Sequence, residues 1–496
     1  MAAHVERIQD VDRKLNAVIL PRFEAALKEA EQADARRSRG EPLGGLHGVP
    51  ITCKECYDLE GMPNTGGGLR WLAQQKSAAD APMLGHLRRA GAVVLGKTNM
   101  PHLMLFNEGD NPLYGRTNNP WDLERTPGGG SSGEGAIIAA GGSPLGLATD
   151  YGGSVRIPPD FCGVQGFRPT YGRFTMAGTF DSKLFPGLET PIDQPGIMSR
   201  TVADIELGFE VLREGGSALP DYTLLPRAWR STDDVSLRGL RVGYYEQDEV
   251  YAAAPVKRRA VREAVQALAD RGAEVEQFLP PDIAHGQGIF LALMSSGGYR
   301  WVGRLRRGER LDRRAGHYAE AMRIPRRLAG PASALMHALG QNTFATYARM
   351  GGQRSTADYW DLILERDRYR DRYLEALDRG RYDVIVCPSN PFPAYRHGAN
   401  YWLAPSHSYT HIYNLLGVPC GHVTTTRVRP GEESDRPVTK DLSNRVAREV
   451  ERGSAGLPAG VQAVGRYWRE DQVLAVMRTL EADFRARPDY PSRPPI

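Results

Sequence analysis

The residues that could do chemistry lie in three short stretches of the chain. Lys54 stands in GVPITCKECYDL, a strand-like run of mainly apolar residues. Two adjacent serines, Ser131 and Ser132, stand in TPGGGSSGEG, and Ser154 stands in TDYGGSVRIP. A serine hydroxyl becomes a nucleophile when a neighbouring base takes its proton, so the stretches are informative together only if they meet in space.

The stretch around Ser154 favours a turn that stabilises negative charge. Two glycines before the serine allow the backbone to turn sharply and to direct several N–H groups at one centre. We therefore expect amide donors to a developing oxyanion from four residues, Tyr151, Gly152, Gly153 and Ser154. Arg156 stands where a GxSxG elbow would have its second glycine, which disfavours an α/β-hydrolase. The alternative is a loop turn without chemistry.

Lys54 is unusual because arginine is the ordinary cation of this chain. Only eight of the 63 basic residues are lysines. Burial disfavours the charged form of a lysine and lowers its pKa toward neutrality, which arginine cannot match. Lys54 is therefore a candidate base. The alternatives are a pair with the adjacent Glu55 or a side chain that reaches the surface.

Two other patterns in these stretches do not predict a cofactor or a metal. The glycines 128, 130 and 133 satisfy GxGxxG, but a turn-like segment with two prolines precedes them and no acidic residue follows at the required distance. Cys53 and Cys56 form a CxxC without a second Cys/His pair nearby, which favours buried packing over zinc or redox use. We expect no cofactor and no metal.

The elements that must position these groups follow from the hydrophobic periodicity. Helical patterns cover residues 22–37, 79–91, 257–271, 359–379 and 471–486, and strand-like runs follow at 92–99, 273–278 and 382–388. Alternation of helices with strands is typical of an α/β protein with a mostly parallel, buried sheet. Residues 281–379 mix arginine clusters with apolar residues, which predicts a helical cap on the sheet or, alternatively, a cap that contacts a membrane surface or admits apolar substrates.

Charge and composition argue against certain binding partners and certain cellular locations. The net charge of +4 over 496 residues is mild and spread along the chain, so we expect no nucleic-acid partner. The charged N-terminal stretch has no apolar core, and no apolar run reaches the ~18 residues of a membrane span. Five cysteines are a sparse, odd set that suits a reducing compartment. A cytoplasmic protein is the expectation.

Taken together, the motifs resemble one family. GVPITCKE, TPGGGSSGEG, SPLGLATDYGGSVRIPPDFCGVQGFRPTYGR and GLPAGVQAVGR are similar to the amidase signature family of serine hydrolases with a Ser–Ser–Lys triad. KE after the lysine, NPLYG, GEG, SPLGL and a RIPRRL-like segment resemble its fatty-acid amide hydrolase-like branch. The resemblance runs from about Val5 to Glu481.

The resemblance implies the architecture and the partners. We expect a single amidase domain over residues 1–496, with a core at about 5–280 and 380–496 and an inserted helical cap at about 281–379. The implied fold is α/β, with a central twisted mixed sheet flanked by helices. The implied partner is a small-molecule amide, without a cofactor, and a homodimer is a further possibility.

The resemblance also implies a mechanism. Neutral Lys54 takes a proton through a bridging serine from Ser154, which attacks the amide carbonyl and forms an acyl-enzyme. Asp150 and Arg156 brace the loop that carries the nucleophile. Met104, upstream of NPLYG, matches a family position that lines the acyl pocket; on the sequence alone it is more often a core residue.

One position departs from the family pattern. The family's bridging serine lies 24 positions before the nucleophile, and Gly130 occupies that position here. Ser131, 23 positions before Ser154, could enter the bridging site by a local rearrangement. Otherwise water fills the gap, or Lys54 acts on Ser154 directly. The functions left open are an amide hydrolase, an acyl transferase or amide-forming enzyme, and a catalytically silent relative that acts as a binding protein.

Overall fold

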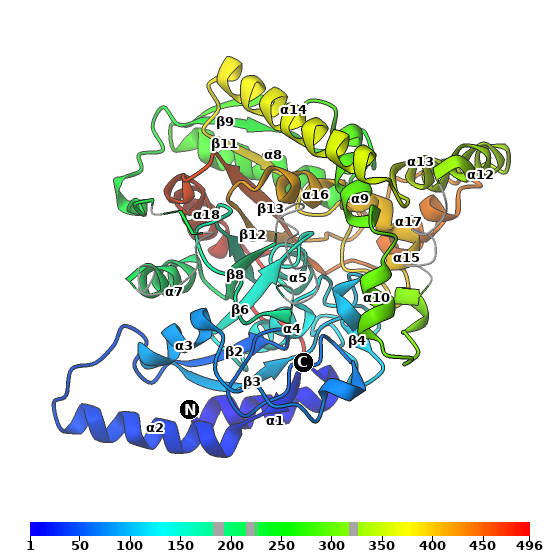
Figure 1. The fold of residues 1–496 in the computed structure, drawn as a ribbon. Coiled ribbons are helices and arrows are strands. Elements are labelled where there is room, and N and C mark those ends of the chain that lie inside the picture. The colour runs from blue at the N-terminus through cyan, green and yellow to red at the C-terminus, as the bar shows by residue number, and fades with distance from the viewer. Residues whose placement is uncertain (181, 183–192, 215–223, 226, 317–325) are drawn as a thin grey trace.

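A large sheet runs through the molecule and helices lie around it (Figure 1). The computed structural model describes residues 1–180, 182, 193–214, 224–225, 227–316 and 326–496. The sheet has eleven strands, in the order β1 (Val18–Pro21), β3 (Val93–Thr98), β2 (Pro50–Lys54), β6 (Leu145–Asp150), β8 (Gln194–Ser199), β7 (Gln165–Arg168), β12 (Cys420–Arg427), β13 (Pro458–Gly465), β11 (Val384–Cys387), β9 (Arg241–Tyr244) and β10 (Glu274–Gln277). A short pair, β4 (Asp110–Asn111) and β5 (Gly115–Arg116), lies outside it.

The sheet is mixed, as the family resemblance implies. β3, β2 and β6 pair in parallel on one side, and β11, β9 and β10 do so on the other. The remaining six of the ten described pairings are antiparallel and fill the centre and one edge. The mostly parallel sheet predicted from helix–strand alternation is therefore wrong. Alternation detects strands joined by helical crossovers, and the central strands are not neighbours of that kind.

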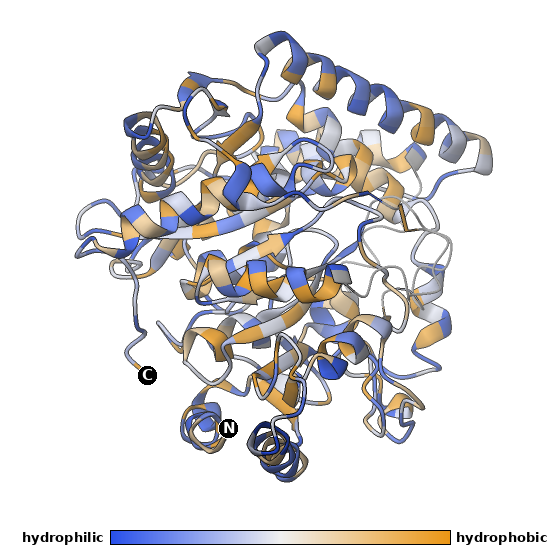
Figure 2. Cartoon of the chain, turned by 90° about the vertical axis from the view of Figure 1, so that its left-hand side faces the viewer, coloured by the Kyte–Doolittle hydropathy of each residue, from blue (hydrophilic) through white to orange (hydrophobic). Residues whose placement is uncertain are grey.

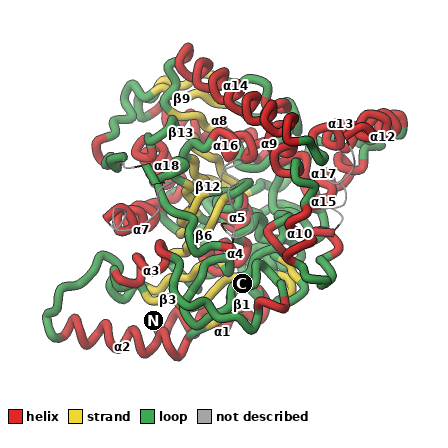
Figure 3. Tube along the Cα trace, viewed as in Figure 1, coloured by secondary structure: helices red, strands yellow, loops and turns green. Residues whose placement is uncertain are grey.

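Helices surround the sheet, as Figure 3 shows in red around the yellow strands. The first group comprises α1 (Ala2–Leu15), α2 (Phe23–Ser38), α3 (Pro82–Arg89), α4 (Ser132–Ala139), α5 (Ile157–Cys162), α7 (Val202–Glu214), α8 (Pro255–Asp270) and α18 (Glu470–Arg485). Three shorter helices, α15 (Asn400–Leu403), α16 (Ser408–Leu416) and α17 (Leu442–Glu451), lie in the C-terminal part. All five helices predicted from periodicity are present, within three residues of the expected bounds.

The predicted cap region contains α9 (Ile283–Ser295), α10 (Arg300–Leu305), α12 (Arg326–Ala338), α13 (Asn342–Met350) and α14 (Thr356–Gly380). Residues 317–325, which include the start of RIPRRL, lie outside the described residues. Most of α9 is buried and shares its apolar cluster with the sheet. α12 instead stands out at one side of the molecule (Figures 1 and 3), where Leu328, Leu335 and Leu339 are more than half exposed. The cap region therefore packs on the sheet through some of its helices and not through α12.

The core joins the sheet to the helices on its faces. One apolar cluster contains sheet residues such as Ile51, Leu147 and Val461 together with residues of α8, α9, α16 and α18. Colouring by hydropathy shows apolar segments throughout the interior, while the long helix α14 at the top of the view is mainly hydrophilic (Figure 2). Of the described helices, none is long and apolar enough to cross a membrane.

A buried carboxyl ties α4 to the strands that end beside the candidate site. Glu134 on α4 accepts hydrogen bonds from Thr52 Oγ1 on β2 (2.7 Å) and from Thr98 Oγ1 on β3 (2.8 Å). Burial raises the pKa of Glu134 to about 8. The helix after the glycine-rich loop is thus joined to the strand of Lys54 by a carboxyl that is mostly protonated at neutral pH.

We expect Glu134→Gln to change the pH dependence of stability. The folded protein keeps a proton on Glu134 between the ordinary carboxyl pKa of 4.5 and about 8, whereas the unfolded chain releases it. The free energy of unfolding of the wild type therefore falls as pH rises through this window. Glutamine mimics the neutral acid, so the variant should gain a few kcal/mol relative to wild type between pH 5 and pH 9, at about 1.4 kcal/mol per pKa unit. Urea unfolding at the two pH values measures the change. A difference in the free energy of unfolding between the two proteins that is the same at both pH values would contradict the prediction.

Candidate active site

Lys54 and Thr149 meet at the ends of two neighbouring parallel strands. β2 and β6 pair with Ile51 opposite Leu145 and Cys53 opposite Leu147, so both strands end at the same edge of the sheet. Lys54 Nζ donates to Thr149 Oγ1 at 2.7 Å. Only 1% of Lys54 is exposed, so its amine lies inside the molecule and does not reach the surface.

The alternative of a Lys54–Glu55 pair does not match the structure. The carboxylate of Glu55 forms its ion pair with Lys97 Nζ, at 3.9 Å, and both side chains are fully buried. Glu55 also accepts hydrogen bonds from the backbone N–H of Gly67 and from Thr65. Glu55 therefore faces another lysine and a backbone turn, while Lys54 faces β6.

A buried ion pair holds the loop that carries Ser154. Arg156 Nε and Nη2 donate to the two carboxylate oxygens of Asp150 at 2.9 and 3.0 Å. Arg156 also donates to Asn414 Oδ1 on α16 (2.6 Å) and to Gln462 Oε1 on β13 (3.1 Å). Burial alone would raise the pKa of Asp150, but the Arg156 guanidinium holds it well below its usual value. The prediction that Asp150 and Arg156 brace this loop is confirmed.

The same carboxylate changes the expected set of oxyanion donors. The backbone N–H of Gly153 donates to Asp150 Oδ1 at 2.7 Å, and the N–H of Val155 donates to Oδ2. In this structure the N–H of Gly153 is thus already engaged by Asp150 and does not point at an oxyanion site. The candidates that remain are the amides of Tyr151, Gly152 and Ser154.

The glycine-rich loop is a close-packed turn against α5. Gly128 and Gly129 have φ values of +80° and +61°, which side chains rarely adopt. A Cβ atom on Gly128 would lie 2.5 Å from the Phe161 ring, and one on Gly129 would lie 2.5 Å from Pro158. Ser132 Oγ lies within hydrogen-bond distance of the carbonyls of both glycines, at 2.8 and 2.7 Å. Ser132 therefore stabilises the turn.

Gly130 lies close to both Ser154 and Lys54. A Cβ atom built on Gly130 would lie 2.7 Å from Ser154 Oγ and 3.4 Å from Lys54 Nζ. The N–H of Gly130 donates to Ser154 Oγ at 2.8 Å. Ser131 Oγ donates instead to the carbonyl of Thr149, at 3.4 Å. The rearrangement that would bring Ser131 into the bridging position is not present in this structure.

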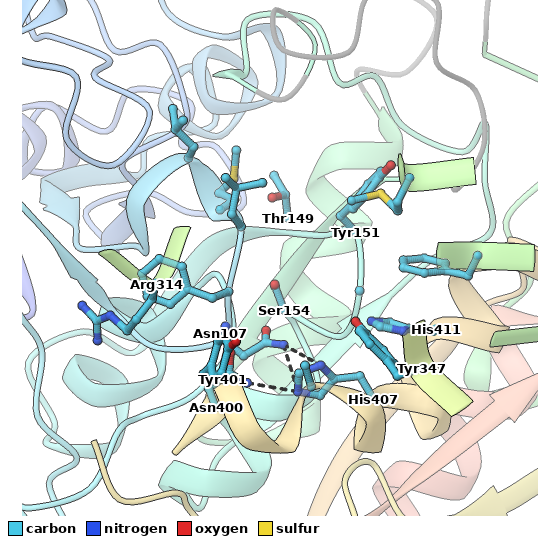
Figure 4. A pocket seen from close by; sticks show the side chains of 18 of the residues that line it. Asn107, Thr149, Tyr151, Ser154, Arg314, Tyr347, Asn400, Tyr401, His407 and His411 are labelled. Atoms are coloured by element: carbon cyan, nitrogen blue, oxygen red, sulfur yellow. Dashed lines mark hydrogen bonds between the residues drawn. The ribbon is translucent and has the colours of Figure 1, made fainter. Parts of the chain in front are cut away.

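A pocket opens beside Ser154, and most of its wall is apolar (Figure 4). Its apolar and aromatic side chains are Leu103, Met104, Leu105, Phe106, Tyr151, Phe290, Met294, Tyr347, Tyr401 and Ala404. Met104 thus lines the pocket. The residues come from the β3–β4 connection, the position directly after β6, α9, α13 and α15 together with the segment that follows it.

Polar side chains that the sequence did not single out line another part of the same pocket. They are Asn107, Thr149, Arg314, Asn400, His407 and His411. In Figure 4, Ser154 lies between Thr149 and the group of His407, Asn107 and Asn400. Thr149 directly precedes Asp150 in the TDYGGS stretch, so it could have been suspected. The histidines carry no such signal, because they stand about 250 residues after Ser154 in a stretch without a recognised motif.

With the geometry described, comparison with known proteins identifies the family. A family model described as Amidase matches residues 1–474. The chain belongs to the amidase family.

Curated relatives and a solved structure agree with this assignment. Fatty-acid amide hydrolase 1 of Sus scrofa is 34% identical over 454 residues, which cover 90% of this chain and 77% of that protein. Fatty acid amide hydrolase 1 of Caenorhabditis elegans is 30% identical over 449 residues, which cover 88% of this chain and 76% of the relative. A structure of fatty acid amide hydrolase superposes with a TM-score of 0.82 at 24% identity, covering 97% of this chain and 81% of that chain. The predicted family, its fatty-acid amide hydrolase-like branch and the α/β fold are confirmed.

The cysteines of this amidase lie in packed surroundings. Cys53 and Cys56 are both fully buried and form no disulfide. Burial raises the pKa of the Cys53 thiol to about 12. Within the described residues, no group of three or more histidine, cysteine or acidic side chains could hold a metal ion.

We expect Asp150→Asn to destabilise this amidase by about 3–5 kcal/mol, because it leaves the Arg156 guanidinium buried without a counter-charge. The double variant Asp150→Asn/Arg156→Gln removes both charges and should recover part of the loss. Chemical denaturation of the three proteins at neutral pH measures the difference. A double variant less stable than Asp150→Asn would show that the charge of Arg156 is not the source of the cost.

Proposed function

We propose that this amidase hydrolyses carboxylic acid amides, with Ser154 as the nucleophile and Lys54 as its base. The observation that carries the proposal is the position of Gly130, whose missing side chain would lie between Ser154 Oγ and Lys54 Nζ. The two reactive groups therefore face one small space beside a pocket that both of them line. Fatty-acid amide hydrolases among the relatives support an amide as the substrate.

The reaction follows from these positions. Neutral Lys54 accepts the hydroxyl proton as Ser154 Oγ attacks the carbonyl carbon of the amide. The amides of Tyr151, Gly152 and Ser154 stabilise the oxyanion. The proton then passes to the leaving nitrogen as the C–N bond breaks and the acyl group remains on Ser154. Water attacks the ester and gives a proton to Lys54. Lys54 returns this proton to Ser154 Oγ as the ester C–O bond breaks, which releases the carboxylic acid and restores both the free serine and the neutral lysine.

A water molecule at Gly130 is the proposed bridge between base and nucleophile. Ser131 Oγ is engaged by the carbonyl of Thr149, which argues against Ser131 as the bridge. Thr149 Oγ1 accepts a hydrogen bond from Lys54 Nζ and thereby holds the amine beside this space. Thr149 is thus a positioning residue, and the bridging proton transfer does not need a second serine.

Active-site labelling tests the nucleophile. We expect a fluorophosphonate to add one adduct mass to the protein at Ser154, detected by peptide mass spectrometry. Ser154→Ala should remove both the adduct and amide turnover. Lys54→Ala should lower kcat by at least about 10², the usual size of one acid–base contribution. Unlabelled Ser154, under conditions that label a control serine hydrolase, would contradict the proposal and favour a silent relative.

Matched variants of one serine test the bridge. Ser131→Ala should keep kcat within about tenfold of wild type, because Ser131 does not bridge. A loss of about 10²–10⁴ would instead identify Ser131 as the relay.

Substitution of Gly130 tests the same bridge by adding a hydroxyl instead of removing one. Gly130 has no positive φ, but a Cβ there requires Ser154 Oγ to move, since the two atoms would be 2.7 Å apart. Gly130→Ser supplies a hydroxyl that can carry the proton, whereas Gly130→Ala supplies the crowding alone. We expect kcat/KM of Gly130→Ser to exceed that of Gly130→Ala by at least about 10². Equal values for the two variants would show that no proton passes through this space.

A second candidate function is transfer of the acyl group to an amine. The lack of a bridging side chain at Gly130 favours acyl transfer. Weaker proton transfer slows the attack of water on the acyl-enzyme more than it slows the attack of an amine, which is the stronger nucleophile. Hydroxylamine or an added amine should then raise product formation and divert the acyl group into a hydroxamate or a new amide. Chromatography of the products decides, and product unchanged by the amine would leave hydrolysis alone.

A further inference from the structure

Two histidines in the pocket have hydrogen-bonding capacity that the proposed hydrolysis does not use. His407 directly precedes α16 and His411 lies on α16, one turn apart, with ring centroids separated by 5.5 Å. They are 5% and 7% exposed, and both line the pocket that contains Ser154. Burial lowers the pKa of His407 to about 4 and that of His411 well below its ordinary value. Each ring is therefore neutral at physiological pH and offers one N–H donor.

The neighbours of His407 determine which of its nitrogens carries the proton. Asn400 Oδ1 accepts the backbone N–H of Asn107 at 3.0 Å, which leaves Asn400 Nδ2 to donate to His407 Nε2 at 3.3 Å. Asn107 Nδ2 lies 3.1 Å from the same His407 Nε2 and 3.3 Å from His407 Nδ1. Nε2 is thus the acceptor in a neutral ring, and the proton is on Nδ1. The neighbour of Nδ1, Asn107 Nδ2, is itself an N–H donor and does not accept this proton.

His411 is held in place by stacking while one of its nitrogens has no partner. Its ring stacks on Phe290 with centroids 4.0 Å apart and an interplanar angle of 10°. In the described part of the chain, His411 Nδ1 is a buried atom without a hydrogen-bond partner. The other nitrogen, Nε2, lies 3.3 Å from the position that a Cβ atom on Gly152 would take. His411 therefore borders the loop proposed to bind the oxyanion.

The charged residue of this wall does not compete for the same ligand. Arg314 forms ion pairs with Glu108 (3.1 Å), Asp110 (2.7 Å) and Asp312 (2.9 Å). Three carboxylates thus surround this guanidinium, so the wall is not built to attract an anionic substrate. The remaining polar capacity belongs to uncharged groups set among apolar side chains.

We propose that His407 and His411 form a subsite for an uncharged hydrogen-bond acceptor, such as an ether or carbonyl oxygen, that the substrate carries close to its scissile amide. This inference deepens the proposed function and rests on it for the reaction that reads it out. The ligand class is a neutral amide whose apolar arms carry one acceptor oxygen. A substrate with an unbroken hydrocarbon chain leaves the imidazole N–H groups without a hydrogen-bond acceptor in a pocket from which it has displaced water. The transition state is then bound less tightly.

Substrates that carry an oxygen atom at successive positions of the chain test the subsite. Two series of matched amides are compared, one with a single ether oxygen at successive positions of the acyl chain and one with the oxygen in the amine part. Each member is paired with its all-methylene analogue. We expect one position to raise kcat/KM by about tenfold or more over its analogue, the effect of satisfying a buried donor. The ratio within one protein is independent of how much of that protein is folded.

Phenylalanine variants assign the effect to the histidines. His411→Phe keeps an aromatic ring against Phe290 but has no N–H, and His407→Phe does the same beside Asn107. Either variant should reduce the oxygen preference to within about twofold of unity. His285→Phe is the matched control, because His285 lies on the outer side of α9 beside Glu365 and does not line this pocket. Its oxygen preference should equal that of the wild type.

Binding to Ser154→Ala, measured by isothermal titration calorimetry with the same amide pairs, separates this inference from the proposed reaction. Suppose that the wild type hydrolyses no amide, that the ether compound binds to Ser154→Ala about tenfold tighter than its all-methylene analogue, and that adding His411→Phe abolishes this difference. The subsite is then supported and the proposed hydrolysis is contradicted. If amides are hydrolysed with no preference at any position, or with a preference that both histidine variants retain, the subsite is wrong.

Discussion

The hydrogen bond between Lys54 Nζ and Thr149 Oγ1 is the contact on which the candidate site depends. It joins the ends of β2 and β6, and the parallel register of these strands places a lysine beside the loop that carries Ser154. Strand register is strict, because a slip of one residue would turn every side chain to the other face. The geometry of the sheet therefore places a buried amine close to the loop of Ser154. Glu55, one residue further, points to Lys97 for the same reason.

The buried pair of Asp150 and Arg156 extends this order from the sheet to the helices. Asp150 closes β6 and takes the N–H groups of Gly153 and Val155, so the turn is held from inside by one carboxylate. Arg156 then reaches α16 and β13, which come from the C-terminal third of the chain. Burying these charged groups costs desolvation free energy. When every member of the network is paired, the hydrogen bonds hold the surrounding segments in one arrangement. The loop, the pocket helix and the centre of the sheet are consequently positioned together.

Much of this arrangement could be predicted from the sequence, and the limits have physical causes. Lys54, Ser154 and the bracing pair stand in contiguous motifs whose geometry is local, and the count of 24 positions correctly placed Gly130 in the gap. The antiparallel centre of the sheet was not predicted, because it is built from strands distant in the chain. The bond from the Gly153 N–H to the carboxylate of Asp150 does not follow from the motif, because two glycines before a serine do not show which acceptor their amides meet. His407 and His411 were missed because a pocket wall brings together segments that share no sequence pattern.

The segment from α15 to α16 supplies three polar residues of the pocket lining, Asn400, His407 and His411, while the proposed base and nucleophile stand at the end of β2 and just after β6. In the proposed function, the residues of the subsite thus stand about 250 residues after Ser154 in the chain and join it only in the folded molecule. Such a division is favourable for directed evolution, since libraries confined to residues 400–411 can reshape what the cavity admits without touching the nucleophile or its base. Asn414 marks the boundary of that freedom, because its amide is bonded to both Asp150 and Arg156.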